Sequence, residues 1–447
     1  MSITSGAAAV TDRPTPSLGQ IDTPLPLGSR LVCALVAIAA FGIYWYSSFI
    51  LEEREGTTHF AADTWFYTEL AEGNVFNRIT ENSNLARIFR FHPTTVVVAA
   101  GWMKLFGFLT PWIEPLYLLK ALFAAVGAVG VWAAMLAFAA LVPHRYVALW
   151  GAIYASSLGV WYFSSIEESK IVTATLSALY IATYLRLRKR WAVRSAVLLT
   201  AILLFACLNE IVAGFLVIIP VVDTLVQRGW DLRHGWWIVW HGLAGPIALA
   251  ILEGIGWGWA GAAGTHAEGA NHFSMLIWYL SKNYFNAESL YAFAVRWFFF
   301  NIAAPETHAD HWADPSINYG GDFQPVLAKY FSSPISASLV ILFGVILVAT
   351  VLPRHRIESG DKQAGILLAF LAYTLLRGMF FFIFNSKECL LFSSSVTLAH
   401  LLMIGIPFTA SILPAKRILL LIFAGLLFGT NGAFIIGDDG LLVPDWR

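Results

Sequence analysis

The sequence predicts an all-α polytopic membrane protein, a bundle of about eleven transmembrane helices with juxtamembrane helices in the first and in a later large external loop. Of its 447 residues, 58% are hydrophobic and only 13% are charged. The mean hydropathy is +0.68. A soluble core of this size would need far more charge to stay dissolved, so most apolar residues must face lipid. The 28 basic and 28 acidic residues cancel, which excludes a generally basic nucleic-acid-binding protein.

Twelve apolar runs are candidates for helices that cross the bilayer, which takes about 20 residues. They are 31–51, 93–110, 115–141, 146–165, 169–187, 193–208, 211–226, 235–256, 335–352, 363–384, 389–412 and 416–436. The first run ends in EERE rather than at a small-residue cleavage site, so we interpret it as a span and not as a signal peptide. The transmembrane domain then covers 31–436. Residues 1–30 are expected to form a disordered cytoplasmic N-terminus, and residues 437–447 an external tail.

The connections between these runs fall into two groups by charge. The basic connections are HR at 144–145, RLRKRWAVR at 186–194, QRGWDLRHG at 227–235, PRHR at 353–356 and PAKR at 414–417. The acidic or neutral connections are EERE, SIEESK, LNE, the long segment 257–334 and NSKE. Because cytoplasmic loops carry an excess of Lys and Arg, we expect the basic group inside.

The two groups alternate strictly from residue 115 onward. With the N-terminus inside, the alternation extends back to the first span only if the run at 93–110 does not cross. That run is short and carries Lys104 in its middle. We therefore predict that it is a helix lying against the bundle, within a first external loop at 52–114. The second large external loop is 257–334.

The segment HFAADTWFY, residues 59–67, follows the first span and holds the leading candidate for chemistry, Asp63. A carboxylate followed by three aromatic residues is too polar for lipid and too apolar for a free loop, so we expect a helix at the membrane interface. A simpler interpretation stays open, in which Asp63 only caps a helix that begins at Thr64.

Ionisable and polar residues at the ends of the spans collect on the side predicted to be external. They are Asp63, Glu69, Lys120, Glu167, Glu168, Asn209, Glu210, Arg377, Lys387 and Glu388. Because burying charge in lipid is costly, each charged group is a functional hypothesis. Carboxylates and cations in one outward-facing cavity suit a base that deprotonates a hydroxyl, next to cations that hold a phosphate leaving group.

These groups also have structural interpretations. They are a solvated turn for Glu167 or Glu168, an ion pair inside the bundle for Glu210 and Arg377, and snorkelling to lipid headgroups for Lys120 and Lys387. Independent structural roles would be spread over both faces of the membrane. The one-sided clustering therefore favours a site.

The second external loop contains PETHADHWAD, in which His308, Asp310 and His311 alternate imidazole and carboxylate groups. Such groups bind divalent cations such as Zn or Mn. The competing interpretation is a polar loop that contacts substrate. The sequence therefore does not establish a cofactor. A divalent cation (Mg, Mn or Zn) stays open as an alternative.

Five other residues are expected to serve packing. Cys33, Cys207 and Cys389 lie in or beside apolar runs without CxxC spacing. His241 and His400 lie within predicted spans and are interpreted as core residues with their hydrogen bonds satisfied.

Asp63, Tyr67 and Ala71 match a pattern of the GT-C superfamily of membrane glycosyltransferases, in which an aspartate after the first span precedes an aromatic and alanine-bearing helix. In the dolichyl-phosphate-mannose and aminoarabinose transferase branch, a Pro-led juxtamembrane helix ending in FG follows. The helix that begins at Pro93 and contains LFGF at 105–108 resembles it.

The resemblance extends to the later connections, and by architecture it covers about residues 31–400. The family often has Arg at the start of span two and Asp in the second external loop, where this chain has Lys120 and Glu167 or Glu168. NSKECLL looks like the late external segment that contacts the donor phosphate, without the usual tyrosine and proline run.

The resemblance implies an inverting glycosyltransferase that moves a sugar from a polyprenyl-phosphate donor to a hydroxyl of a glycan or lipid acceptor on the extracytoplasmic face. Membrane lipids surround such an enzyme and no nucleic acid is involved. We expect a bacterial inner membrane location with a cytoplasmic N-terminus. The implied roles are general base for Asp63, acceptor or cation site for Glu167, Glu168 and Glu210, and donor-phosphate site for Lys120, Arg377 and Lys387.

Two other classes stay open. A secondary transporter would use Glu210 and Arg377 as coupling groups near the membrane midplane, although the chain has no internal repeat of the kind that marks many transporters. A lipid- or glycan-handling scaffold without transferase activity is the third. It predicts that every external carboxylate can be neutralised without loss of phenotype.

Overall fold

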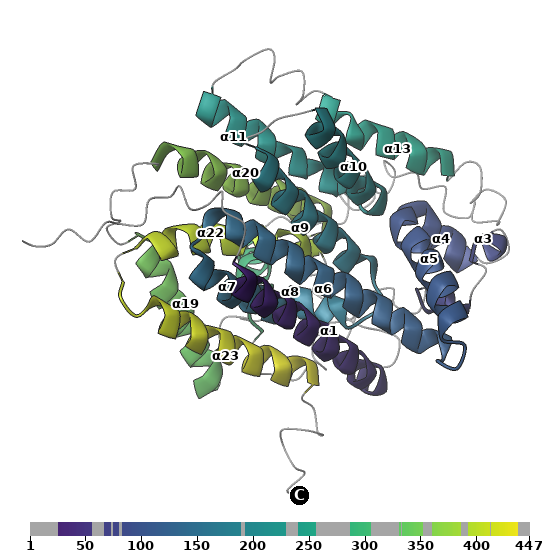
Figure 1. Cartoon of the computed structure of the whole chain (residues 1–447), viewed down its shortest axis with the longest axis horizontal. Helices are drawn as coiled ribbons and strands as arrows, with labels where there is room; N and C mark the ends of the chain where they lie inside the picture. The colour runs from purple at the N-terminus through teal and green to yellow at the C-terminus, as the bar shows by residue number, and fades with distance from the viewer. Residues whose placement is uncertain are drawn as a thin grey trace, which may run out of the picture.

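The computed structural model describes most of the chain as helix (Figure 1). The described residues are 26–55, 67–72, 75–79, 83–188, 193–228, 240–255, 287–304, 330–331, 333–351, 360–385, 392–411 and 413–436. No β-strand occurs in these ranges. The all-α class predicted by the sequence is therefore confirmed.

The helices follow the predicted apolar runs closely. In chain order they are α1 (Leu27–Glu55), η2 (Glu69–Glu72), α3 (Val75–Arg78), α4 (Ser83–Phe91), α5 (Pro93–Leu109), α6 (Pro115–Leu141), α7 (His144–Ser156), α8 (Leu158–Ser164), α9 (Ser169–Leu187), α10 (Val193–Asn209), η3 (Ile211–Val217), α11 (Ile218–Arg228), α13 (Ala244–Ile255), α15 (Ala287–Ala294), η6 (Val295–Phe300), α19 (Pro334–Val351), α20 (Gly360–Asn385), η7 (Ser394–Val396), α22 (Thr397–Ala410) and α23 (Lys416–Ile436).

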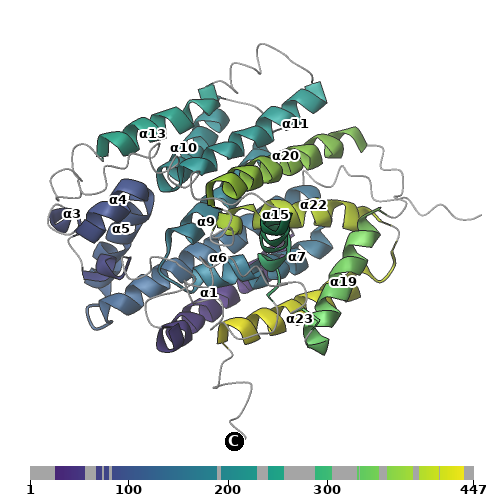
Figure 2. The same cartoon turned by 180° about the vertical axis from the view of Figure 1, so that it is seen from behind.

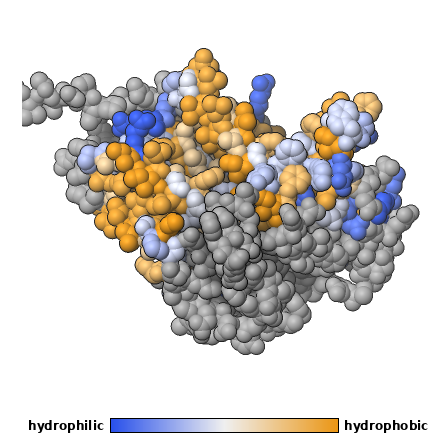
Figure 3. All heavy atoms as spheres, turned by 90° about the horizontal axis from the view of Figure 1, so that it is seen from below, coloured by the Kyte–Doolittle hydropathy of each residue, from blue (hydrophilic) through white to orange (hydrophobic). Residues whose placement is uncertain are grey.

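Five helices in the described ranges are long and apolar enough to cross a membrane, namely α1, α6, α19, α20 and α23. Their outward faces carry large exposed apolar side chains, including Leu35 on α1 and Ile341 on α19. Figure 3 shows apolar side chains over a broad part of the described surface. A water-soluble protein seldom exposes such continuous apolar surface, so this is a membrane-embedded protein.

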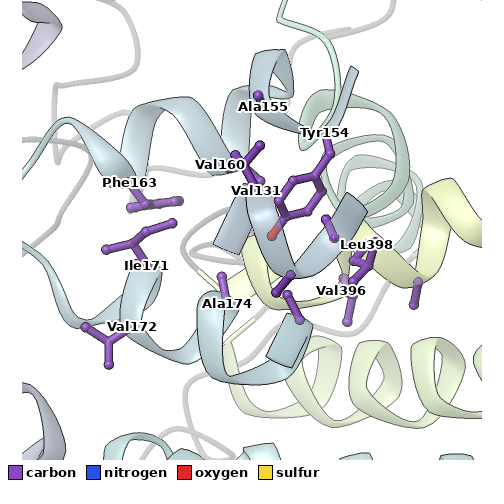
Figure 4. Close-up of a cluster of buried hydrophobic side chains, with 14 of the residues drawn as sticks. Val131, Tyr154, Ala155, Val160, Phe163, Ile171, Val172, Ala174, Val396 and Leu398 are labelled. Carbon is purple, nitrogen blue, oxygen red and sulfur yellow. The ribbon is translucent and has the colours of Figure 1, made fainter. Parts of the chain in front are cut away.

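The long helix α6 lies at the centre and packs against α1, α7 and α9. Small residues let its backbone approach these neighbours. A Cβ atom added to Gly127 would lie 2.1 Å from Ser164 Oγ, and one added to Gly130 would lie 2.7 Å from Thr175 Oγ1. Figure 4 shows the resulting apolar cluster, in which side chains from α6, α7, α8, α9, η7 and α22 meet. Close approach of small residues is the usual basis of helix packing in membranes.

The run predicted at 146–165 is broken at Ser157 into α7 and α8. The first two N–H groups of α8, on Leu158 and Gly159, donate to the backbone oxygens of Ile302 and Asn301 at 3.0 and 2.9 Å. A distant segment therefore satisfies donors that a helix start would leave unbonded.

Asn431 on α23 fixes that distant segment, residues 301–304. Its Oδ1 accepts a hydrogen bond from the Ala304 N–H at 2.7 Å, and its Nδ2 donates to the backbone oxygens of Ile302 and Ser156 at 2.8 and 2.6 Å. One buried amide in the last helix thus ties the 301–304 segment to the end of α7.

Helix α5 lies across one end of the bundle. Near its start, Thr94 Oγ1 donates to the backbone oxygen of Phe205 at 2.9 Å, close to the end of α10. Farther along, Trp102 Nε1 donates to the backbone oxygen of Leu118 at 2.9 Å, close to the start of α6. Figures 1 and 2 both place α4 and α5 at one end of the long helices and inclined to them. That 93–110 does not cross the membrane stays a prediction.

Candidate functional site

Among the described residues, four of those singled out from the sequence form two pairs, Lys120 with Glu167 and Glu210 with Arg377, whereas Glu69 lies 3.6 Å from Arg78. Lys120 is in the first turns of α6. Its Nζ lies 3.1 Å from Glu167 Oε1, in the connection between α8 and α9. It also donates to the backbone oxygen of Ser48 on α1 at 3.1 Å. Three segments far apart in the sequence thus share one buried ammonium group.

Lys120 and Glu167 are 3% and 5% exposed, so both charges are inside the protein. Snorkelling to lipid is therefore the wrong interpretation for Lys120, and a solvated turn is the wrong one for Glu167. Both charges can be buried because the attraction between them offsets the hydration that each group loses inside the protein. Phe49 supports the pair with its ring centroid 5.8 Å from Lys120 Nζ.

Glu168 is also buried and caps α9. Its Oε1 accepts hydrogen bonds from Ser169 N and Ser169 Oγ, both at 2.8 Å. Its backbone is extended, with φ −147 and ψ 141, as expected for a residue that precedes a helix. The solvated-turn interpretation is thus wrong for Glu168 as well, because its side chain is buried and caps the start of α9.

Glu210 and Arg377 form an ion pair inside the bundle. Glu210 stands between α10 and η3, and Arg377 is a fully buried residue of α20. The structural interpretation of these two residues is therefore correct as a description of their contact. The ion pair does not use all the donors of Arg377, because its Nε and Nη1 have no hydrogen-bond partner in the described part of the chain.

Asn209 precedes Glu210 in the sequence and bonds Ser169, which follows Glu167 by two residues. Its Nδ2 donates to the Ser169 backbone oxygen and to Thr173 Oγ1, both at 2.9 Å. Its Oδ1 accepts from Thr95 N at 3.1 Å and from Thr95 Oγ1 at 2.6 Å. His92 Nδ1 lies 2.5 Å from the Asn209 backbone oxygen. The side-chain amide thus uses its two donors and two acceptor positions, and it fixes α10 against the starts of α9 and α5.

Lys170 is a site residue that the sequence reasoning missed. It is 6% exposed, and its Nζ lies 4.4 Å from the ring centroid of Phe392. It has no carboxylate partner in the described residues. The signal in the sequence is a lysine at the head of an apolar run, in the connection SIEESK that is acidic overall.

A stack of two aromatic rings separates Lys170 from Arg377. Phe392 and Phe381 are parallel within 12°, with ring centroids 4.1 Å apart. The Arg377 guanidinium carbon lies 5.2 Å from the Phe381 centroid. Two cations therefore sit on the outer faces of one phenylalanine pair, an arrangement that stabilises both through cation–π attraction.

Several predicted residues lie outside the described ranges, namely Asp63, His308, Asp310, His311, Lys387 and Glu388. Of the three residues Asp63, Tyr67 and Ala71 that match the family pattern, the structure describes Tyr67 and Ala71, and both are buried. The Tyr67 ring lies 6.3 Å from that of His92 and 6.5 Å from that of Phe123, centroid to centroid. Within the described residues, no group of three or more His, Cys, Asp or Glu side chains is arranged to hold a metal ion.

The predicted packing residues are buried where they are described. His241 Nε2 lies 2.6 Å from Tyr180 Oη, and its Nδ1 lies 2.9 Å from Thr200 Oγ1, so the prediction of satisfied hydrogen bonds is confirmed there. It is not met for His400 within the described residues, where its ring nitrogens have no hydrogen-bond partner and its ring packs against Phe298. Cys33 and Cys207 are buried and free, and Cys389 is outside the described ranges.

No family model matches this sequence, no curated protein resembles it significantly, and no solved structure matches its fold significantly. The described fold and the candidate site together define a membrane-embedded helical protein with two buried ion pairs, Lys120–Glu167 and Glu210–Arg377.

Proposed function

We propose that this protein is an integral membrane glycosyltransferase that moves a sugar from a polyprenyl-phosphate donor to an acceptor hydroxyl. The observation that carries this proposal is the clustering of Lys120, Glu167, Glu210 and Arg377 at one end of the bundle. Ionisable groups inside a membrane protein are costly and commonly mark a substrate site. The clustering therefore supports a chemical role for this end.

Asp63 is the proposed general base, which takes the proton from the acceptor hydroxyl. Tyr67 follows it by four residues in the sequence and packs against His92 and Phe123 at the same end of the bundle, which supports this assignment. A phosphate leaving group needs little protonation, so one base with nearby cations suffices. A single in-line displacement would invert the anomeric centre.

The donor phosphate is proposed to contact Arg377 and Lys170. A cation that already faces a carboxylate attracts a phosphate less, because the carboxylate partly cancels its charge. Lys170 has no such partner in the described residues. Arg377 does face Glu210, but its Nε and Nη1 have no hydrogen-bond partner in the described residues and remain as donors for a phosphate oxygen. In this scheme Lys120 mainly balances Glu167, while Lys387 is a third proposed phosphate contact. His308, Asp310 and His311 stay a proposed divalent-cation set.

The proposed topology has eleven spans, a cytoplasmic N-terminus and an extracytoplasmic site, in a bacterial inner membrane. The position of α5 across the end of the bundle supports it, because the basic loops then share one side.

Asp63→Asn tests the proposal. We expect transfer to fall by about 10²-fold or more, because general-base catalysis contributes about 10²–10⁴-fold. The assay uses purified protein in proteoliposomes with a panel of polyprenyl-phosphate sugars and membrane-extracted acceptors. The matched control is Glu114→Gln, an exposed carboxylate in the connection before α6. Near-normal turnover of Asp63→Asn would rule Asp63 out as the base.

A secondary transporter is the second candidate, and the buried Glu210–Arg377 pair beside the broken helix at η3 favours it. It predicts proton- or sodium-dependent uptake in proteoliposomes that Glu210→Gln abolishes. Uptake with no transferase activity would replace the first proposal with this one.

A further inference from the structure

A pocket of about 710 Å³ lies where α1, α7 and α23 begin. It is at the other end of the bundle from Glu167, and in Figure 1 this is the end away from α4 and α5. The 27 residues of α6 separate the two ends, about 40 Å at helical rise. This distance is close to the full thickness of a bilayer with its headgroup regions. The pocket and the candidate site thus belong to opposite membrane faces.

One part of the pocket lining is cationic. Arg145 and Arg417 are exposed, and His144 lies beside them. No carboxylate lines the pocket, and neither arginine has an ion pair in the described residues. The Arg145 guanidinium carbon lies 5.0 Å from the Tyr146 ring centroid. Because the ring has no net charge, this contact does not neutralise the arginine. The nearby Lys416 ammonium is already held, because it donates to the backbone oxygen of Thr409 at 2.8 Å.

The rest of the lining is apolar and continues onto the outside of the bundle. Val32 on α1 is 47% exposed, and Ile418 and Leu421 on α23 are 63% and 62% exposed. In a membrane-embedded protein such faces contact acyl chains. The pocket therefore joins a cationic mouth to a surface suited to hydrocarbon.

Three helices also direct their N-terminal ends toward this region. α1 begins at Leu27, α7 at His144 and α23 at Lys416. The partial positive charge of each helix start adds to that of the two arginines. The local potential thus favours an anion, while the neighbouring apolar faces favour an amphiphile over a water-soluble ion.

We infer that this pocket binds the headgroup of an anionic phospholipid. The phosphate lies against Arg145, Arg417 and His144, and the acyl chains lie along the exposed faces of α1 and α23. Basic pockets between membrane helices are suited to anionic headgroups, and the volume is within the usual range of ligand sites. The inference does not depend on the transferase proposal, since it concerns the opposite face.

Native mass spectrometry of the full-length protein in detergent tests the inference with phosphatidylglycerol and phosphatidylcholine of identical acyl chains. We expect the first bound phosphatidylglycerol to bind at least about tenfold more tightly than phosphatidylcholine, because two arginines act on its net charge. Arg145→Gln with Arg417→Gln should remove that preference. Ala148→Phe, which fills the pocket without changing its charge, should weaken phosphatidylglycerol binding as well.

The matched control is Arg186→Gln with Arg194→Gln. These arginines are exposed at the end of α9 and the start of α10, on the same side of the bundle, and do not line the pocket. The control should keep the preference. Equal binding of the two lipids to the unchanged protein, or an equal loss in the control, would overturn the inference. Displacement of the lipid by millimolar inorganic phosphate would also overturn it, because it would mark a site for a free anion.

Discussion

At the scale of single residues, the site depends on charges that are stable only together. Lys120 and Glu167 are both buried, 3.1 Å apart, with the lysine also bonded to Ser48. The sequence predicted that these residues lie on one side of the membrane, but it did not indicate which acidic residue pairs with which basic residue. Pairing depends on contacts such as Lys120 with Glu167, 47 residues apart, which only the packed bundle defines. The same holds for Lys170, whose burial depends on Phe392.

Removing one member of the pair should cost more than removing both. We expect Lys120→Met to destabilise the protein by about 3–5 kcal/mol, because it leaves Glu167 buried without a counter-charge. Lys120→Met combined with Glu167→Gln should recover much of that loss. Thermal unfolding in detergent measures both, with Lys104→Met on the exposed side of α5 as control. Equal losses in the single and double variants would contradict a coupled pair.

Lys170 should act through its charge. If it contacts the donor phosphate, Lys170→Met should lower kcat/KM by roughly 10- to 100-fold, the worth of one hydrogen bond to a charged group. Lys170→Arg should keep most of the activity. A packing role would give the opposite order, because methionine fits against Phe392 with less disturbance than arginine does. Initial rates across donor concentrations separate the two outcomes.

At the scale of helices, uninterrupted apolar runs were predictable and broken ones were not. The predicted runs 115–141, 169–187 and 416–436 match α6, α9 and α23 residue for residue, because polar or helix-breaking residues bound a single apolar stretch. The break at Ser157 has only a weak local cause, the Ser and Gly residues of SSLG and the hydrogen bond from Ser157 Oγ to the Ile153 backbone oxygen. It also depends on hydrogen bonds from α8 to the 301–304 segment, and a distant contact of this kind leaves no periodic signal in the sequence.

The attachment of α5 should depend on Asn209. We expect Asn209→Leu to loosen the start of α5, because Thr95, Ser169 and Thr173 would lose their shared partner. Trypsin should then cut faster after Lys104, which is exposed on that helix. Thr94→Val, which removes a single hydrogen bond to Phe205, should have a smaller effect. Unchanged cleavage in Asn209→Leu would show that apolar packing alone holds α5.

At the scale of the whole molecule, the two ends of the bundle differ in chemistry. One end holds the buried pairs Lys120–Glu167 and Glu210–Arg377. The other end holds the pair Arg188–Asp223, and there Arg145 and Arg417 are exposed around a pocket with no ion pair among the described residues. Loop charges predicted this asymmetry, because the bias toward cytoplasmic Lys and Arg is strong enough to read without a structure. The ion pairs and the pocket at the two ends could not be predicted from the sequence, since they depend on which side chains become buried.

Labelling of single cysteines tests which end faces out. In a variant without the native cysteines, Glu114→Cys should react with a membrane-impermeant maleimide in intact cells. Arg186→Cys should react only after lysis, since it lies at the basic end. Labelling of Arg186→Cys in intact cells would reverse the orientation and remove the basis for an extracytoplasmic site.

The contacts of Asn431 constrain the order in which this chain matures. The corner between α7 and α8 is synthesised early, yet the 301–304 segment that bonds it comes much later, and the amide that fixes that segment belongs to the last helix. A ribosome delivers these pieces in sequence. The N–H groups of Leu158 and Gly159 therefore lack these partners until residues 301 and 302 have been made, and the contacts of Asn431 can form only after the final helix has been added.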